Sequence, residues 1–251
     1  MVFIAKTSTP TEWKAVIVAI STLVDEACFE ATPDGITFRA MDPSHVALID
    51  LTWPNSAFEK YNCDKEFRFA VRVDDFAKLI KRADSKDSVE INAMDSEALI
   101  LKLSNGYKRE FKIHLIESSY GPTPLPKLSF NTRIIMNEGV FEKILNDISI
   151  IADHVTLETS EKGIVFSGKS DKGTAQITLE KGSKDILELE VKEESKATYS
   201  IDYLLNITKA LSSISETLQC EYSSKMPLRL EFKLTEYGGR IHFYLAPRVE
   251  G

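Results

Sequence analysis

The spacing of apolar side chains predicts four helices. In four segments a large apolar residue is followed by apolar residues three and four positions later, the stripe by which a helix packs on a core. In the fourth segment a threonine replaces the last member of the stripe. The segments are 9–24, 73–83, 137–151 and 200–214. The first residues of their stripes recur at intervals of 63, 65 and 63 positions and are Trp13, Phe76, Phe141 and Leu204. This regular interval predicts an internal repeat.

Residues that favour helix starts stand at the beginning of each segment. Three segments open with an acidic or amide residue whose side chain can accept bonds from free backbone N–H groups. The first segment, 9–24, opens instead with a threonine before a proline, which suits the first turn of a helix. The predicted start residues are Asp74, Asn137, Asp202 and Thr9 before Pro10.

Each predicted helix is followed by polar and apolar residues in strict alternation, the pattern of half-buried strands. Two strands joined by a turn come first, within 27–42, 88–103, 155–168 and 217–232. A third strand follows, within 45–53, 109–117, 174–181 and 240–247. Each repeat is therefore predicted to be strand, helix, then three strands. One such repeat cannot bury its sheet face alone, so at least two must pack together.

The segment 117–130 contains three prolines and one glycine and has no helical period. Such a composition is typical of a semi-rigid, extended connector. We therefore predict an N-terminal domain over 1–116, a connector over 117–130 and a C-terminal domain over 131–251.

Composition bounds the class of protein. The 251 residues include 43% hydrophobic residues and no apolar run long enough to cross a membrane. The first residues lack the features of a signal peptide. The cysteines are odd in number and far apart, which favours reduced thiols and an intracellular protein; they are Cys28, Cys63 and Cys220.

One catalytic motif matches, but its context does not. The stretch "GIVFSGKS" (163–170) fits the phosphate-binding loop of nucleotide hydrolases, which must open into a helix. Here the residues on both sides are strand-like, so we predict a hairpin and no nucleotide site. The histidines are scattered without metal-ligand spacing; they are His45, His114, His154 and His242. We expect no catalytic residue, metal or cofactor.

Basic residues recur on the predicted helices. Lys78, Lys81 and Arg82 have the spacing of one helix face, opposite the apolar stripe. The other helices carry Lys14, Lys143 and Lys209. Either these are solvated faces or they bind an anionic partner. The net charge of −7 by itself argues against nucleic acid, but a basic inner face can coexist with an acidic exterior.

Two end motifs carry a resemblance to a known family. "MDPSHVALIDL" (41–51) resembles the "M-D-S-S-H-V-x-L" signature of proliferating cell nuclear antigen, the sliding clamp of archaea and eukaryotes. "YLAPRVEG" (244–251) resembles the closing motif of that family. "FEKYNCD", "MPLRLEF" and the fourfold repeat agree along the whole chain. Pro43 departs from the usual serine, and the connector is more similar to archaeal forms.

The resemblance implies an α+β DNA-clamp fold with four βαβββ repeats in two similar domains. Three subunits would form a ring, with helices lining a hole for duplex DNA and sheets outside. The basic residues that match the family's pore-facing positions are Lys14, Lys78, Lys81, Lys143 and Lys209, and Arg82 is added by its helical spacing. The implied function is that of a DNA polymerase sliding clamp, a non-catalytic processivity factor.

The resemblance also implies two protein-binding surfaces. Edge strands would join neighbouring subunits through Phe111, Ile113, Ala175, Ile177 and Leu179; from the residues alone, these strands could equally be core strands. A groove for short peptides of partner enzymes would be lined by Met41, His45, Val46, Leu48, Pro227, Tyr244, Ala246 and Pro247. Tyr120, Leu125 or Leu128 would close it from the connector.

The implied partners are duplex DNA, DNA polymerase, ligase, flap nuclease and a separate ATP-driven clamp loader. They place the protein on chromosomal DNA inside the cell. Two alternatives remain. One is an enzyme that uses the 163–170 loop. The other is a clamp-like subunit of a heterotrimer or of a checkpoint-type ring.

Overall fold

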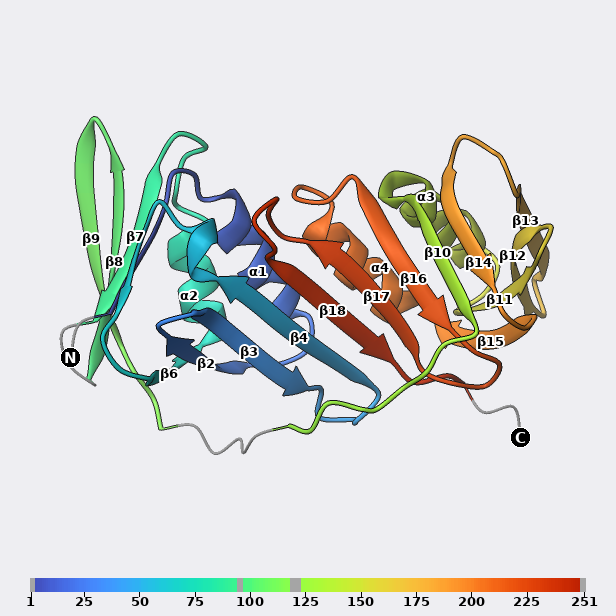
Figure 1. The fold of residues 1–251 in the computed structure, drawn as a ribbon, viewed down its shortest axis with the longest axis horizontal. Helices are drawn as coiled ribbons and strands as arrows, with labels where there is room; N and C mark the ends of the chain where they lie inside the picture. The colour runs from blue at the N-terminus through green and yellow to red at the C-terminus, as the bar shows by residue number, and fades with distance from the viewer. Residues whose placement is uncertain (1–2, 94–96, 118–122, 249–251) are drawn as a thin grey trace. The chain divides into compact units, whose positions relative to one another are not determined.

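The computed structural model describes residues 3–93, 97–117 and 123–248. The chain divides into two compact units (Figure 1). The first comprises 1–123 and 233–241, and the second comprises 124–232 and 242–251. Each unit is built from two of the predicted repeats.

The first unit contains two helices, α1 (Thr11–Ser21) and α2 (Val73–Ile80), in its described residues. Its strands are β1 (Phe3–Thr7), β2 (Glu26–Thr32), β3 (Gly35–Met41), β4 (Ala47–Pro54), β5 (Lys60–Cys63), β6 (Phe67–Arg72), β7 (Ser88–Ala93), β8 (Ala98–Asn105) and β9 (Tyr107–His114).

The second unit repeats this order of elements. Its helices are α3 (Glu138–Ser149) and α4 (Ile201–Leu211). Its strands are β10 (Thr132–Asn137), β11 (His154–Ser160), β12 (Gly163–Ser170), β13 (Gly173–Glu180), β14 (Ile186–Val191), β15 (Ser195–Ser200), β16 (Thr217–Tyr222) and β17 (Leu228–Lys233). The last strand, β18 (Arg240–Leu245), crosses the boundary between the units in sequence.

The predicted fourfold order of strand, helix and three strands is confirmed. Two short strands were missed, β5 and β14, each of which precedes the second repeat of its unit. Both add to a sheet edge beside the first strand of the unit: β5 pairs with β1, and β14 pairs with β10. These two strands carry little periodic signal because each has only one buried residue, so neither shows a clear alternation of buried and exposed positions.

The two repeats of each unit exchange strands. In the first unit, β1 belongs to the first repeat but pairs with β7 of the second, and β6 of the second repeat pairs with β2 of the first. In the second unit β10 pairs with β16 and β15 pairs with β11 in the same way. Neither repeat has a complete sheet without the other, which explains why a single repeat does not suffice.

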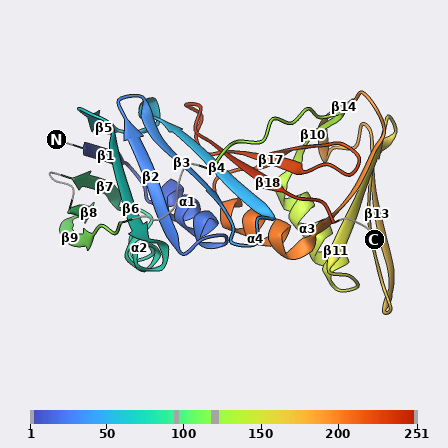
Figure 2. The same cartoon turned by 90° about the horizontal axis from the view of Figure 1, so that it is seen from below.

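The first residue of each helical stripe lies at the centre of the core. Trp13, Phe76, Phe141 and Leu204 are all fully buried. In the first unit the rings of Trp13 and Trp53 are 4.6 Å apart. The helices pack in pairs, α1 on α2 and α3 on α4. Figure 2 shows α1 and α2 side by side, on the same side of the sheet that contains β2 and β3.

The predicted helix starts are partly wrong. Only Asn137 caps its helix, by accepting a bond of 3.2 Å from the Val140 N–H. The residues before α2 and α4 are Arg72 and Ser200, with extended backbone, because each strand runs directly into its helix. Asp74 and Asp202 instead lie in the first turn, where a carboxylate favours the positive end of the helix dipole. The residue before α1 is Pro10, and Thr9 donates to Glu12.

The segment 163–170 forms β12 and turns into β13, with which it pairs along its whole length. The hairpin prediction is therefore confirmed, and the loop has no helix N-terminus on which to hold phosphate. In the described residues none of the three cysteines forms a disulfide; Cys63 and Cys220 are buried, and Cys28 is half-buried. Among the described helices, none is long and apolar enough to cross a membrane.

Candidate functional site

The basic residues predicted on the helices differ in how exposed they are and in how closely they lie along the chain. Lys78, Lys81 and Arg82 are exposed near the end of α2. The helix itself ends at Ile80, so the helical spacing that grouped Arg82 with the lysines does not apply to it. The three exposed side chains nevertheless lie within five positions of one another, with Lys78 in the last turn of α2 and Lys81 and Arg82 just after it.

Lys14 has a contact within its own unit that its position on α1 did not predict. It is half-buried, and its Nζ donates to the carbonyl oxygen of Ala83 at 2.6 Å. This carbonyl lies just beyond the end of α2, where backbone acceptors lack helical partners. Lys14 therefore joins the two helices of the first unit, which leaves fewer of its donors for an external phosphate.

The helices of the second unit carry isolated basic residues. Lys143 on α3 and Lys209 on α4 are both exposed. Exposed carboxylates share these helices, Asp147 on α3 and Asp202 on α4. In the first unit, Lys78 has an acidic neighbour as well, with its Nζ 3.6 Å from Asp75. Acidic side chains therefore equal or outnumber basic ones within each helix, and the only group of three exposed residues among the basic residues predicted on the helices lies at and just beyond the end of α2.

The two strands predicted to join subunits each lie at the edge of a sheet. The order of the first sheet is β5-β1-β7-β8-β9, and that of another is β13-β12-β11-β15. Edge strands expose backbone donors and acceptors that can pair with another chain. Their position leaves both strands able to pair with a neighbouring subunit, and that pairing stays a prediction.

The side chains on the two edges differ in exposure. Ala175, Ile177 and Leu179 are half-buried and share one face of β13. Phe111 on β9 is half-buried too, but Ile113 is only 8% exposed. Ile113 therefore packs mainly inside its own unit, and the remaining four residues are the ones with surface left for a neighbour.

The corner in "MDPSHVA" is organised by the carboxylate of Asp42. It accepts from the backbone N–H groups of Ser44 at 3.2 Å, Val46 at 2.7 Å and Ala47 at 2.6 Å. His45 takes a left-handed backbone conformation with φ of 59°, which histidine tolerates better than most residues. Pro43 is exposed in this turn, where a missing N–H has no cost.

This corner presents part of the predicted groove. Met41 and Val46 are half-buried and His45 is exposed, so all three have surface for a partner. Leu48 is only 2% exposed, so it supports the groove from beneath more than it lines it.

The second unit holds the other predicted groove residues. Pro227, Ala246, Pro247 and Leu128 are half-buried, and Leu125 is exposed. Tyr244 is buried, with 6% of its surface exposed. The remaining predicted residue, Tyr120, lies outside the described residues.

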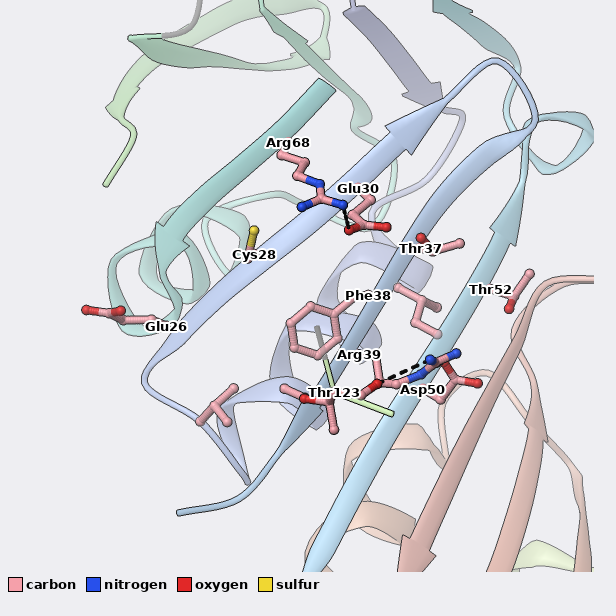
Figure 3. A pocket seen from close by; sticks show the side chains of 13 residues that line it. Glu26, Cys28, Glu30, Thr37, Phe38, Arg39, Asp50, Thr52, Arg68 and Thr123 are labelled. Carbon is pink, nitrogen blue, oxygen red and sulfur yellow. Dashed lines mark hydrogen bonds and ion pairs between the residues drawn. The ribbon is translucent and has the colours of Figure 1, made fainter. Parts of the chain in front are cut away.

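A hollow of about 300 Å³ lies on the outer face of the sheet formed by β6, β2, β3 and β4 (Figure 3). Cross-strand ion pairs line it: Arg68 lies 2.7 Å from Glu30, and Arg39 lies 2.8 Å from Asp50. Arg39 and Asp50 are directly opposite on β3 and β4, one row from the pair Met41 and Leu48. The hollow therefore lies on the same sheet face as Met41 and Leu48, two of the predicted groove residues in the first unit.

The second unit carries a related ion pair on β16 and β17. Arg229 lies opposite Glu221, and its Nε donates to Glu221 Oε2 at 2.7 Å. Burial alone would lower the pKa of the Arg229 guanidinium. Hydrogen bonds and charge from Glu221, and then from Tyr244, outweigh this effect, so the pKa is raised above its usual value. Arg229 on β17 therefore interacts with both neighbouring strands, with Glu221 on β16 and with Tyr244 on β18. Neither Arg39 nor Arg229 was singled out from the sequence, although an arginine opposite a carboxylate in a hairpin is a detectable signal.

Within the described ranges, no group of three or more histidine, cysteine, aspartate or glutamate side chains is arranged to hold a metal ion. The His154 Nδ1 is 3.1 Å from Arg248 Nη1. Burial, and then Arg248, lower the pKa of His154, while Asp153 and Asp202 oppose this shift. His242 is 2.7 Å from Glu231. These two histidines are therefore engaged in pairwise contacts within the second unit.

Four βαβββ repeats, with strands exposed at two sheet edges and helices packed in pairs, together define an α+β protein with the DNA-clamp fold. Comparisons with known proteins agree. Residues 2–118 match the model of the N-terminal domain of proliferating cell nuclear antigen, and residues 124–248 match that of its C-terminal domain. The chain belongs to the proliferating cell nuclear antigen family.

Curated relatives match along their full length. A DNA polymerase sliding clamp of Nitrosopumilus maritimus is 52% identical over 100% of both chains. One of Cenarchaeum symbiosum is 51% identical over 99% of both chains. A crystal structure of PCNA from Thermococcus kodakaraensis superposes with a TM-score of 0.93 at 24% identity, covering 98% of this chain and 100% of that one. That likeness supports the fold.

Proposed function

We propose that this chain is a DNA polymerase sliding clamp, a non-enzymatic processivity factor that encircles duplex DNA and holds replication and repair enzymes on it. The observation that carries the proposal is the full-length match to relatives of that name at 52% identity. The unpaired edges of β9 and β13 and the basic cluster on α2 are consistent with it.

Three copies form the proposed ring by pairing β9 of one subunit with β13 of the next. Phe111 on one side and Ala175, Ile177 and Leu179 on the other supply apolar contact, and Ile113 supports β9 from within. The helices face the hole, where lysines and Arg82 contact phosphates. Such contacts carry no base sequence and exchange readily, so the ring slides.

A test of encirclement compares two DNA topologies. Rings loaded by a clamp loader and ATP should remain on a closed plasmid circle and leave a linearised plasmid of the same sequence. The measurement is co-elution of labelled protein with DNA after gel filtration at 150 mM salt. Equal retention on both forms would show binding by affinity alone and would contradict the proposal.

The partner surface in this proposal is a groove for short peptides. Its members are Met41, His45, Val46, Pro227, Tyr244, Ala246, Pro247 and connector residues Leu125 and Leu128, with Leu48 beneath and Tyr120 outside the described residues. The division into 1–116, 117–130 and 131–251 makes the connector one edge of this groove. Polymerase, ligase, flap nuclease and clamp loader would share it, on chromosomal DNA in the cell.

Peptide binding is tested separately from ring formation. Tyr244→Ala or Leu128→Ala should weaken binding of a fluorescent peptide from a DNA polymerase while the oligomeric mass stays unchanged. A trimer mass for the isolated chain also separates a homotrimer from an obligate subunit of a heterotrimer, which would elute as a monomer.

A further inference from the structure

The first described residue after the gap in the connector, Thr123, is held by an arginine. Arg39 Nη1 donates to the Thr123 carbonyl oxygen at 3.3 Å. The same guanidinium donates through Nε to Asp50 Oδ1 at 2.8 Å. Figure 3 shows Arg39 directed toward Asp50 on the neighbouring strand, with Thr123 close by. Arg39 thus joins β3, β4 and the connector.

The other end of the connector also meets an arginine. The Arg229 guanidinium carbon lies 5.0 Å from the centre of the Phe130 ring, a cation–π distance. Both Nε and Nη2 of Arg229 donate to Glu221 Oε2. The next residue along the chain is held as well, since the Asn131 backbone N–H donates to the Ser223 side-chain Oγ at 2.9 Å. Arg229 thus joins β16, β17 and the connector.

Each arginine is oriented by a carboxylate of its own sheet, independently of its contact with the connector. Arg39 is directly opposite Asp50, and Arg229 is directly opposite Glu221, so the ion pairs are properties of the sheets. An arginine whose rotamer is already restricted loses less entropy when it binds a further group. Two rigid sheet surfaces therefore present a ready donor and a ready cation at the two ends of a proline-rich segment.

Two other arginines have the same kind of ion pair but no hydrogen bond or ring contact with the described residues of the connector. Arg68 lies opposite Glu30 on β6 and β2, and Arg133 lies opposite Glu190 on β10 and β14. The side chains of Arg133 and Arg229 are equally exposed, at 28%. Arg68 and Arg133 therefore separate the effect of holding the connector from the effect of losing a cross-strand ion pair.

We propose that Arg39 and Arg229 are positioning residues that hold the described part of the connector, 123–130, at its first and last residues and so keep one edge of the peptide groove in its binding conformation. This rests on the proposed function, because it concerns the same groove. Contact between Arg229 and Tyr244 gives the second arginine an additional route to that groove. A connector released at either end must be ordered when a peptide binds, and that entropy loss weakens affinity.

The test uses Arg39→Met and Arg229→Met, with Arg68→Met and Arg133→Met as matched controls. The Kd of a fluorescent synthetic peptide from a DNA polymerase should rise roughly fivefold in each of the first two variants. If the effects are independent, the double variant should lose roughly 25-fold. The controls should bind as the wild type does. Arg229→Lys should recover only part of the loss, because an ammonium lacks the planar fork.

Hydrogen exchange supplies a readout that simple destabilisation does not imitate. Backbone amides of 123–131, apart from prolines, should exchange faster in the two test variants, while amides of β3 and β17 keep their protection. Unchanged exchange in 123–131, or equal affinity loss in the control variants, would overturn the positioning role. Failure of the wild type to bind the peptide would instead overturn the proposed groove, and the exchange result would still decide whether the arginines hold the connector.

Discussion

The N-terminal and C-terminal units have the same order of repeats and the same exchange of strands, but their surfaces carry different side chains. The first unit gathers Lys78, Lys81 and Arg82 at the end of α2, whereas Lys143 and Lys209 stand apart in the second. The edge strands differ as well. The exposed side chains of β9 include Lys108 and Lys112, and those of β13 are mostly neutral and polar.

The comparison teaches which positions the fold constrains. The buried first residues of the stripes are large and apolar in all four repeats, because each fills the space between a helix and two sheets. Exposed positions contribute little to this packing, so the two units can diverge there without a change of fold. The differences between the units are therefore the best places to look for separate functions.

The largest effect is expected at the neutral edge. Ile177→Asp should dissociate the proposed ring, because its half-buried side chain would place an unpaired carboxylate in the interface. Dissociation should become easier by at least about 100-fold in concentration. Light scattering coupled to size exclusion measures it. Thr178→Asp, on the exposed face of the same strand, should leave the mass unchanged; a monomer from that control would assign the contact to the wrong face.

The next effect concerns the uneven basic charge. Replacing Lys78, Lys81 and Arg82 together by alanine should weaken DNA binding at low salt more than the double variant Lys143→Ala and Lys209→Ala. Each lost phosphate contact should reduce the slope of log K against log salt by about 0.9. Fluorescence anisotropy with a short duplex across a salt series gives these slopes. If DNA affinity fell equally per removed charge in both units, clustering of the basic residues at the end of α2 would not strengthen DNA binding.

A buried carboxyl group distinguishes the start of α3 from that of α1. Glu138 is 4% exposed, and burial, followed by the charge of Glu142, raises its pKa to about 7. The exposed Thr11 begins α1. Because the folded pKa lies above the unfolded value, the stabilising effect is present below about pH 4.5 and is lost as pH rises through 7.

Glu138→Gln should therefore raise the free energy of unfolding at pH 8 by about 1–2 kcal/mol and change it little at pH 4. Urea titrations at the two pH values measure the difference. Glu142→Gln should give a smaller gain, since that residue acts only through its charge. A gain of equal size at both pH values would show that packing, and not ionisation, is responsible.

The smallest effect is expected for Lys14, which joins α1 to the end of α2. Lys14→Met should lower the free energy of unfolding by about 1 kcal/mol, the usual net value of one hydrogen bond. It should change DNA affinity less than Lys78→Met does. Thermal unfolding and the duplex assay measure the two properties, and a variant with wild-type stability and impaired DNA binding would show that Lys14 acts mainly on DNA.

Much of the fold was predictable because burying one face of a helix or strand makes apolar residues recur at a regular interval along the sequence. The four helices, the strand triplets and the hairpin at 163–170 all follow from alternation and stripe spacing. The missed strands β5 and β14 are short edge additions. The incorrect starts at Asp74 and Asp202 arose because a strand that enters a helix directly needs no separate capping residue.

The candidate site was less predictable from local pattern. The sequence offered the basic residues, the corner at Asp42 and the closing motif, but it could not show that Lys14 is used by Ala83 or that Leu48 and Ile113 are largely covered. Those outcomes depend on residues far apart in the chain. The same is true of Arg39 and Arg229, whose importance appears only when Thr123 and Phe130 are found beside them.

The sequence by itself determined the repeat, its helices and most strands, and the family, because these depend on periodic burial and on contiguous motifs. Only the tertiary structure decided which strands are edges, which lysine is already engaged and what holds the connector. Such contacts are selected by distance in space, and no period along the chain encodes them.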